Sequence, residues 1–114
     1  MKPIKFIHDL ERLRNHPLHA TMEELFAMYT DPPQRPEDDG WLVLIEHDDV
    51  DRLLTDLDMP WKLSEVPFEG VHKVNGCFYA VYLANNQFGI GFLIPNEAWL
   101  PAELRRHLEN HLDP

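Results

Sequence analysis

Two asparagine-containing corners, Asn75-Gly76 and Asn85-Asn86, divide residues 71–94 into three short apolar segments. Asn-Gly is the strongest short signal for a two-residue β-hairpin turn, because both residues tolerate the positive φ angles of a type I′ turn. Asn-Asn is a weaker form of the same signal. The sequence therefore predicts a three-stranded antiparallel meander in this half of the chain.

Two-residue turns at both corners would fix the register of the meander. Val74 would then lie opposite Cys77, and Val81 opposite Ile90. One sheet face would collect the core side chains Val74, Cys77, Tyr79, Val81, Leu83, Phe88, Ile90, Phe92 and Ile94. The other face would carry Val71, Phe78, Ala80, Tyr82, Gly89, Gly91 and Leu93.

On that second face, Phe78 and Tyr82 are expected to stand beside Gly89 and Gly91. Glycine inside a strand often marks close approach by another chain or a ligand, and exposed aromatic patches are typical of contact surfaces. The face is either a dimer or partner interface, or an inner layer covered by the chain's own helices or by residues 59–68. The sequence leaves both alternatives open.

A further strand precedes the meander. Trp41 to Ile45 is apolar on both alternating faces, which is typical of a strand covered on both sides. Asp48 then has the position of a helix N-cap, and the apolar residues that follow recur at the helical period: Val50, Leu53, Leu54 and Leu57. We expect this helix to connect the strand to the meander by a crossover, with the strand's place in the sheet left open.

Three other helices complete the prediction. Helical spacing of apolar residues predicts a first helix over 4–15. Thr21 and Glu24 form a capping-box pattern before a second helix over 22–29, and a last helix begins at Pro101. The expected fold is a single α+β domain of order α-α-β-α-β-β-β-α, with a four-stranded, largely antiparallel sheet packed by helices.

The negative charge is concentrated in one quarter of the chain. The sequence carries 20 acidic and 10 basic side chains, a formal net charge of −10. Residues 31–58 hold ten of the acids against Arg35 and Arg52, a net charge of −8. Such a surface repels a phosphate backbone, so direct nucleic-acid binding is not expected. It either steers a basic protein surface or acts only as a solvated face that keeps the chain soluble.

Length and cysteine content limit the class of protein. A chain of 114 residues can build one core, and a lone Cys77 cannot form an intrachain disulfide, which fits a reducing compartment. No apolar run approaches the ~18 residues that a membrane span requires, and charged side chains interrupt the first residues of the chain. We therefore expect a soluble, cytoplasmic, single-domain protein.

Candidate reactive groups each have a simpler structural explanation. The run Glu46-His47-Asp48-Asp49 follows a strand, a position at which these side chains could bind a divalent cation or act as acid and base. Helix capping and the helix dipole, however, account for its two aspartates. The only serine lies outside any nucleophile motif, and the five glycines form no phosphate cradle.

The remaining histidine and cysteine patterns are also weak. His107 and His111 have the i, i+4 spacing of a metal pair without an evident third ligand, and His16 and His19 only bracket a proline. Cys77 is expected among aliphatic core residues. We predict no catalytic residue, no metal site and no cofactor.

These observations favour a non-enzymatic interaction module over an enzyme. We expect an acidic protein that self-associates or docks onto a basic protein partner, in the manner of an inhibitor, immunity factor or antitoxin. Its steering charges would be Asp38, Asp39, Asp48, Asp49, Asp51 and Asp56, and its anchors Trp61, Phe78 and Tyr82. The alternative is a small-molecule-binding protein or enzyme whose pocket between sheet and helices uses Glu46, His47, His72 and Tyr79.

Overall fold

The computed structural model describes residues 2–4, 7–29, 41–85 and 88–112. Its elements, with η for a short 3₁₀ helix, are β1 (Lys2–Ile4), α1 (Ile7–Glu11), α2 (His19–Tyr29), β2 (Trp41–Leu44), η1 (His47–Asp49), η2 (Thr55–Leu57), η3 (Leu63–Glu65), β3 (Gly70–Val74), β4 (Cys77–Asn85), β5 (Phe88–Ile94) and α4 (Ala102–Asn110). The predicted α+β class is confirmed.

The five strands form one mixed sheet in the order β1-β2-β5-β4-β3. Strands β3, β4 and β5 make the expected antiparallel meander, but β2 pairs in parallel with β5, and β1 pairs antiparallel with β2. The prediction of four largely antiparallel strands is therefore wrong in detail. A strand of three residues is too short to show a period of two, so helical spacing assigned Ile4 to a helix although it is buried in β1 opposite Leu42.

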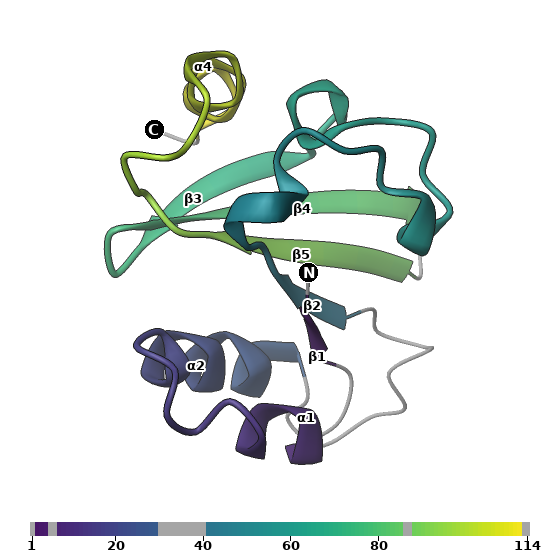
Figure 1. Ribbon diagram of the computed structural model, residues 1–114. Coiled ribbons are helices and arrows are strands. Elements are labelled where there is room, and N and C mark those ends of the chain that lie inside the picture. Colours follow the sequence, from purple (N-terminus) through teal and green to yellow (C-terminus); the bar gives the residue numbers. More distant parts are fainter. Residues whose placement is uncertain (1, 5–6, 30–40, 86–87, 113–114) are drawn as a thin grey trace.

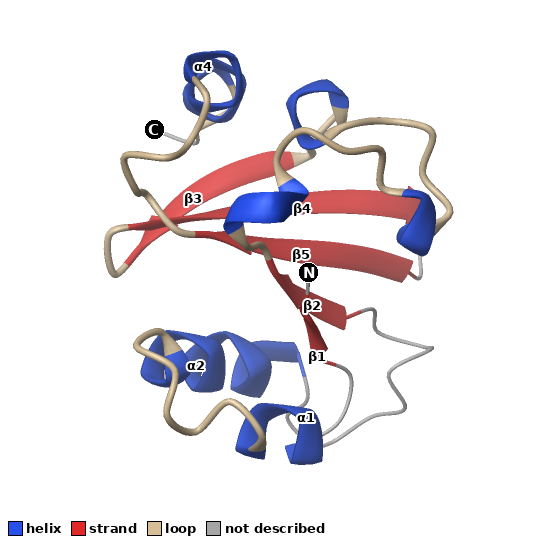
Figure 2. Ribbon diagram, viewed as in Figure 1, coloured by secondary structure: helices blue, strands red, loops and turns tan. Residues whose placement is uncertain are grey.

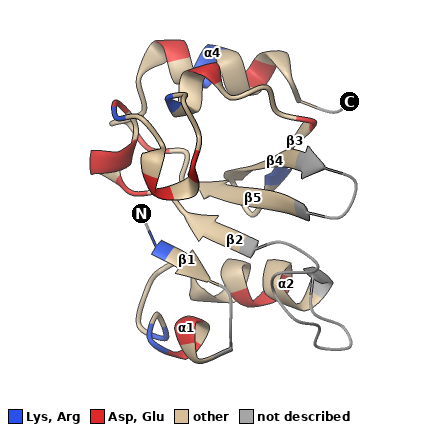
Figure 3. Cartoon of the chain, turned by 90° about the vertical axis from the view of Figure 1, so that its right-hand side faces the viewer, with Lys and Arg blue, Asp and Glu red and all other residues tan. Residues whose placement is uncertain are grey.

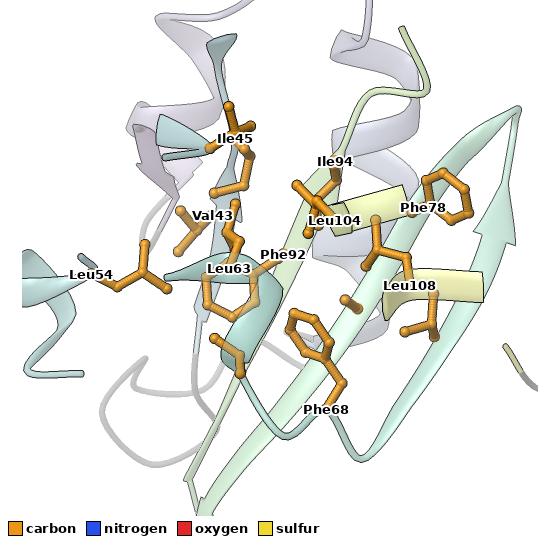
Figure 4. Close-up of a cluster of buried hydrophobic side chains, with 14 of the residues drawn as sticks. Val43, Ile45, Leu54, Leu63, Phe68, Phe78, Phe92, Ile94, Leu104 and Leu108 are labelled. Carbon is orange, nitrogen blue, oxygen red and sulfur yellow. The ribbon is translucent and has the colours of Figure 1, made fainter. Parts of the chain in front are cut away.

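Both faces of the sheet are covered (Figures 1 and 2). Helices α1 and α2 lie on one face, while α4 and the chain between β2 and β3 lie on the other. The second face builds the larger cluster of buried side chains, which includes Val43, Ile45, Leu54, Leu63, Phe68, Phe78, Phe92, Ile94, Leu104 and Leu108 (Figure 4). The α1–α2 face builds the smaller cluster: Ile4, Leu10, Met22, Leu25, Leu42, Leu44, Cys77, Tyr79 and Leu93.

The predicted crossover helix after β2 is replaced by the short helices η1 and η2. The amide of Leu54 donates to the carbonyl of Trp61 at 2.8 Å, and the carbonyl of Leu54 accepts from Met59 at 3.1 Å. These bonds fold the segment back on itself instead of extending a helix. Leu54 is fully buried, but Leu53 remains 47% exposed, so the apolar period predicts which residue is inside without predicting the helix.

The N-terminal helices also begin and end at other positions than predicted. Helix α1 covers only Ile7–Glu11, and α2 begins at His19, before the predicted capping residue Thr21. Thr21 therefore lies inside the helix and is 5% exposed, so the capping-box prediction is wrong. The last helix, Ala102–Asn110, begins directly after Pro101 as predicted.

The first predicted corner is confirmed and the second is shifted. Asn75 and Gly76 have φ angles of 51° and 82°, and Val74 pairs with Cys77 as expected. Between β4 and β5, however, the pairing passes from Leu83↔Gly89 to Asn85↔Phe88, which inserts one extra residue on the β4 side. Such a bulge reverses the faces of β5 relative to those expected.

The reversal puts Phe78 and Tyr82 of β4 on the same face as the β5 residues of the larger cluster. Tyr82 lies opposite Ile90 and Ala80 opposite Phe92, whereas Gly89 lies opposite Leu83. Phe78 is 1% exposed within the larger cluster. The predicted face on which Phe78 and Tyr82 stand beside Gly89 and Gly91 therefore does not form, and Phe78 belongs to an inner layer that the chain itself covers.

Candidate functional site

The chain between β2 and β3, residues 46–69, forms an acidic cover over the larger cluster. It carries eight acidic and two basic side chains, a net charge of −6, and its acidic positions lie on the α4 side of the sheet (Figure 3). Val50, Leu63 and Val66 on the same segment are buried and fix it to the sheet. The acidic cover is thus held by apolar contacts, and its charged side chains other than Asp49 are at least partly exposed.

Asp49 organises the start of the acidic cover. Its Oδ2 accepts a hydrogen bond from the Glu46 amide at 2.7 Å, and its Oδ1 accepts from Nε and Nη2 of Arg52 at 3.3 Å. Burial on its own would raise the pKa of Asp49, but hydrogen bonds, including those from Glu46 and Arg52, more than offset it and lower the pKa below its ordinary value of 3.8. Asp49 is 2% exposed, so it supports the cover from within and its charge is not accessible at the surface.

Arg52 forms ion pairs with two carboxylates of the acidic cover. Besides Asp49, its Nη2 donates to Oδ2 of Asp56 at 3.1 Å. The hydrogen bond with Asp56 is the main cause that raises the pKa of Arg52 above its ordinary value, and Asp49 adds to it. The side chain of Asp48 is fully exposed, that of Asp56 is 62% exposed, and Asp51 is exposed. These carboxylates therefore present a negative surface to solvent.

Apolar side chains accompany this negative surface. Trp61 and Tyr82 are half-buried and meet edge to face, with 5.9 Å between ring centroids. Leu53 is 47% exposed on the same acidic cover, and Trp99 packs edge to face with His47 at 5.4 Å. Of the three predicted anchors, Trp61 and Tyr82 are accessible, but Phe78 is buried. The exposure of Leu53 was not predicted, because the spacing of Leu53 from its apolar neighbours assigned it to a buried helix face.

The predicted small-molecule pocket is not assembled. Glu46 pairs with Lys2 at 4.0 Å, and Lys2 belongs to β1, one edge of the sheet. His72 lies on β3, the opposite edge, beside Tyr79 at a ring distance of 6.4 Å. Tyr79 belongs to the smaller cluster, whereas His47 contacts Trp99, which packs on the larger cluster. The four side chains therefore do not converge.

The histidine pair His107 and His111, at the end of α4, connects this helix to the segment that precedes β3. Nε2 of His107 lies 2.7 Å from the Val66 carbonyl, and Nδ1 of His111 lies 2.9 Å from the His107 carbonyl, so each of these nitrogens donates. Both rings pack on Phe68, and the His111 carbonyl accepts from the Val71 amide of β3. Among the residues that the structure describes, no three His, Cys, Asp or Glu side chains are placed to share a metal ion.

Other predicted residues have simple positions. Cys77 is 5% exposed in the smaller cluster. Nδ1 of His16 accepts from the Leu18 amide at 3.0 Å, which stabilises the turn before α2. Asp38 and Asp39 lie outside the described residues.

In the described parts of the chain, no helix combines the length and apolar character needed to cross a bilayer. No protein-family model, curated protein sequence or solved structure matches the chain.

Proposed function

We propose that this protein is a non-enzymatic interaction module that docks onto a basic protein partner through the acidic cover. The observation that carries the proposal is the presence, on one segment, of exposed carboxylates and accessible apolar side chains. Asp48 and Asp51 provide long-range attraction, while Leu53 and Trp61 provide surface that excludes water on contact.

The internal ion pairs of the acidic cover support the same proposal. Arg52 is engaged by Asp49 and Asp56, so its cation is already neutralised within the fold. The remaining carboxylates keep a strong net negative field that a complementary cationic surface would relieve. Electrostatic complementarity of this kind raises association rates more than it raises affinity. The effect of charge should therefore appear mainly in the association rate constant.

The test is to recover the partner at low salt and then measure the kinetics of the purified pair. Association should slow as ionic strength rises, because salt screens exposed charges. Asp48→Lys and Asp51→Lys should each slow association, while Glu23→Lys on α2 should not, although it changes net charge equally. Equal effects of all three variants, or association that is insensitive to salt, would contradict docking through the acidic cover. A stable dimer of the chain alone in light scattering would indicate self-association instead.

A further inference from the structure

The turn between β3 and β4 is tied to helix α2 by one side chain. Nδ2 of Asn75 donates to Oγ1 of Thr21 at 3.0 Å and to Oε2 of Glu24 at 3.3 Å. Thr21 is 5% exposed, and Glu24 is exposed one helical turn further along. We call these three side chains the Asn75 clasp. It connects residues more than fifty positions apart and holds α2 to the hairpin of the sheet.

The same asparagine precedes Gly76, and both residues are exposed. Glycine has no side chain to shield its backbone nitrogen, and nothing lies within 4 Å of the position that a Cβ of Gly76 would occupy. An asparagine amide followed by such a nitrogen can react with it intramolecularly. The Asn75-Gly76 turn therefore combines a reactive dipeptide with a structural function of its side chain.

We propose that Asn75 is a site of spontaneous deamidation that breaks the polar link between α2 and the hairpin of the sheet, while the buried contacts of Met22 and Leu25 remain. The backbone nitrogen of Gly76 attacks Cγ of Asn75 and loses its proton to solvent base. A bond forms between that nitrogen and Cγ, the bond between Cγ and Nδ2 breaks as Nδ2 takes a proton from solvent, and ammonia leaves. Water then opens the resulting five-membered imide at either carbonyl and yields aspartate or isoaspartate at position 75.

The Asn75 clasp slows this reaction in the folded protein. Ring closure requires the side chain to rotate until Cγ meets the Gly76 nitrogen, and the leaving nitrogen Nδ2 is held at α2 by two acceptors. Both hydrogen bonds must break before the side chain can turn. The rate of modification therefore reports how often the clasp opens.

The product cannot restore the clasp. A carboxylate has no N–H to donate to Thr21, and it places a second negative charge beside the carboxylate of Glu24. Asparagine and aspartate both tolerate the positive φ of 51° at this position, so the backbone turn need not change when the product is aspartate. Isoaspartate adds one carbon to the main chain and alters the turn as well. The modification thus acts on the contact with α2 and converts an attraction into a repulsion.

The rate is tested by incubating the folded protein in mildly alkaline buffer and following conversion at Asn75 by peptide mass spectrometry. Wild type should convert more slowly than a free peptide of residues 71–80. Thr21→Val should convert several-fold faster than wild type, while Ile94→Val, a mild truncation in the larger cluster, should convert at the wild-type rate. Equal rates for Thr21→Val and Ile94→Val, or no conversion in wild type while the peptide converts, would overturn the proposal.

The consequence is tested with variants that mimic the product. Asn75→Asp should raise the unfolding equilibrium constant about tenfold, because hydrogen bonds are lost and like charges are brought together. Asn75→Gly removes the bonds without adding charge and should have a smaller effect. Glu24→Gln should restore most of the difference between Asn75→Asp and Asn75→Gly. An unfolding midpoint of Asn75→Asp equal to that of wild type would show that the modification breaks no stabilising contact.

Discussion

The carboxylate of Asp49 accepts a hydrogen bond from the Arg52 guanidinium at 3.3 Å and, at its other oxygen, from the Glu46 amide at 2.7 Å. Asp49 is 2% exposed, whereas Asp48 and Asp51 beside it are exposed. Neighbouring aspartates in one acidic run therefore do different work. Asp49 stabilises the acidic cover, and Asp48 and Asp51 are exposed to solvent.

This arrangement predicts that Asp49→Asn destabilises the fold by about 1–3 kcal/mol, because asparagine has no charge and only one acceptor oxygen, so the Glu46 amide or the Arg52 guanidinium loses its acceptor. Asp51→Asn, at an exposed position two residues away, should change the free energy of unfolding by less than about 0.5 kcal/mol. Urea denaturation of both variants measures the difference. Similar losses for the two would show that Asp49 has no special structural role.

The same carboxylate predicts a dependence of stability on acid. Because the pKa of Asp49 is lower in the folded protein than its ordinary value of 3.8, its contribution is fully present above that value and is lost as pH falls through the folded pKa. The stability gap between wild type and Asp49→Asn should be constant above about pH 5 and close in stronger acid. A gap that stays constant into strong acid would contradict this assignment.

Cys77 gives a prediction about chemical reactivity. Burial raises the pKa of its thiol above the ordinary value of 9.0, the charge of Glu97 adds to the rise, and a backbone hydrogen bond from Asn96 partly offsets it. A buried neutral thiol is a poor nucleophile. A thiol reagent at neutral pH should modify Cys77 at least roughly 100-fold more slowly in buffer than in urea. Rapid labelling in buffer would place the thiol at the surface.

Gly89 tests the register of the last hairpin. A Cβ at this position would come within 3.0 Å of Cδ2 of Leu83, whose side chain is 49% exposed. Gly89→Ala should be close to neutral in wild type, where the two side chains crowd each other. In a Leu83→Ala background the same change should stabilise by about 0.5–1 kcal/mol, because alanine restricts the unfolded chain more than glycine does.

The comparison for this test is Tyr82→Phe, which leaves Leu83 in place and should not alter the effect of Gly89→Ala. The two-residue turn expected from the sequence would instead put Gly89 opposite Tyr82. Absence of coupling between Gly89 and Leu83 in the double-mutant cycle would therefore argue for that other register.

The shifted corner shows why the pattern of apolar residues could not decide the register. Chain segments cover both faces of this sheet, so β5 buries Phe92 on one face and Leu93 on the other. A slip of one residue in the pairing of β4 with β5 then exchanges one apolar set for another. Both registers bury apolar side chains, so the apolar pattern does not distinguish them. The Asn75-Gly76 corner was predictable because its turn chemistry fixes the register locally.

The candidate site, like the sheet, has parts that the sequence predicts and parts that depend on tertiary contacts. The sequence located the acidic segment and the accessible residues Asp48, Asp51, Trp61 and Tyr82. It could not separate Asp49 from its neighbours, because burial of one carboxylate depends on where Arg52 and the Glu46 amide lie. It also assigned Thr21 and Glu24 to a local cap, whereas both accept from Asn75 across the fold.

The sequence by itself determined the α+β class, the first hairpin, the last helix and the acidic character of one segment. Each depends on neighbours along the chain, through turn chemistry, apolar period or local charge. Only the tertiary structure decided the parallel pairing of β2 with β5, the bulge that reversed the faces of β5, and the return of the 46–69 segment through the hydrogen bond from the Leu54 amide to the Trp61 carbonyl. These features depend on contacts between distant residues, and several arrangements of them satisfy the same local pattern.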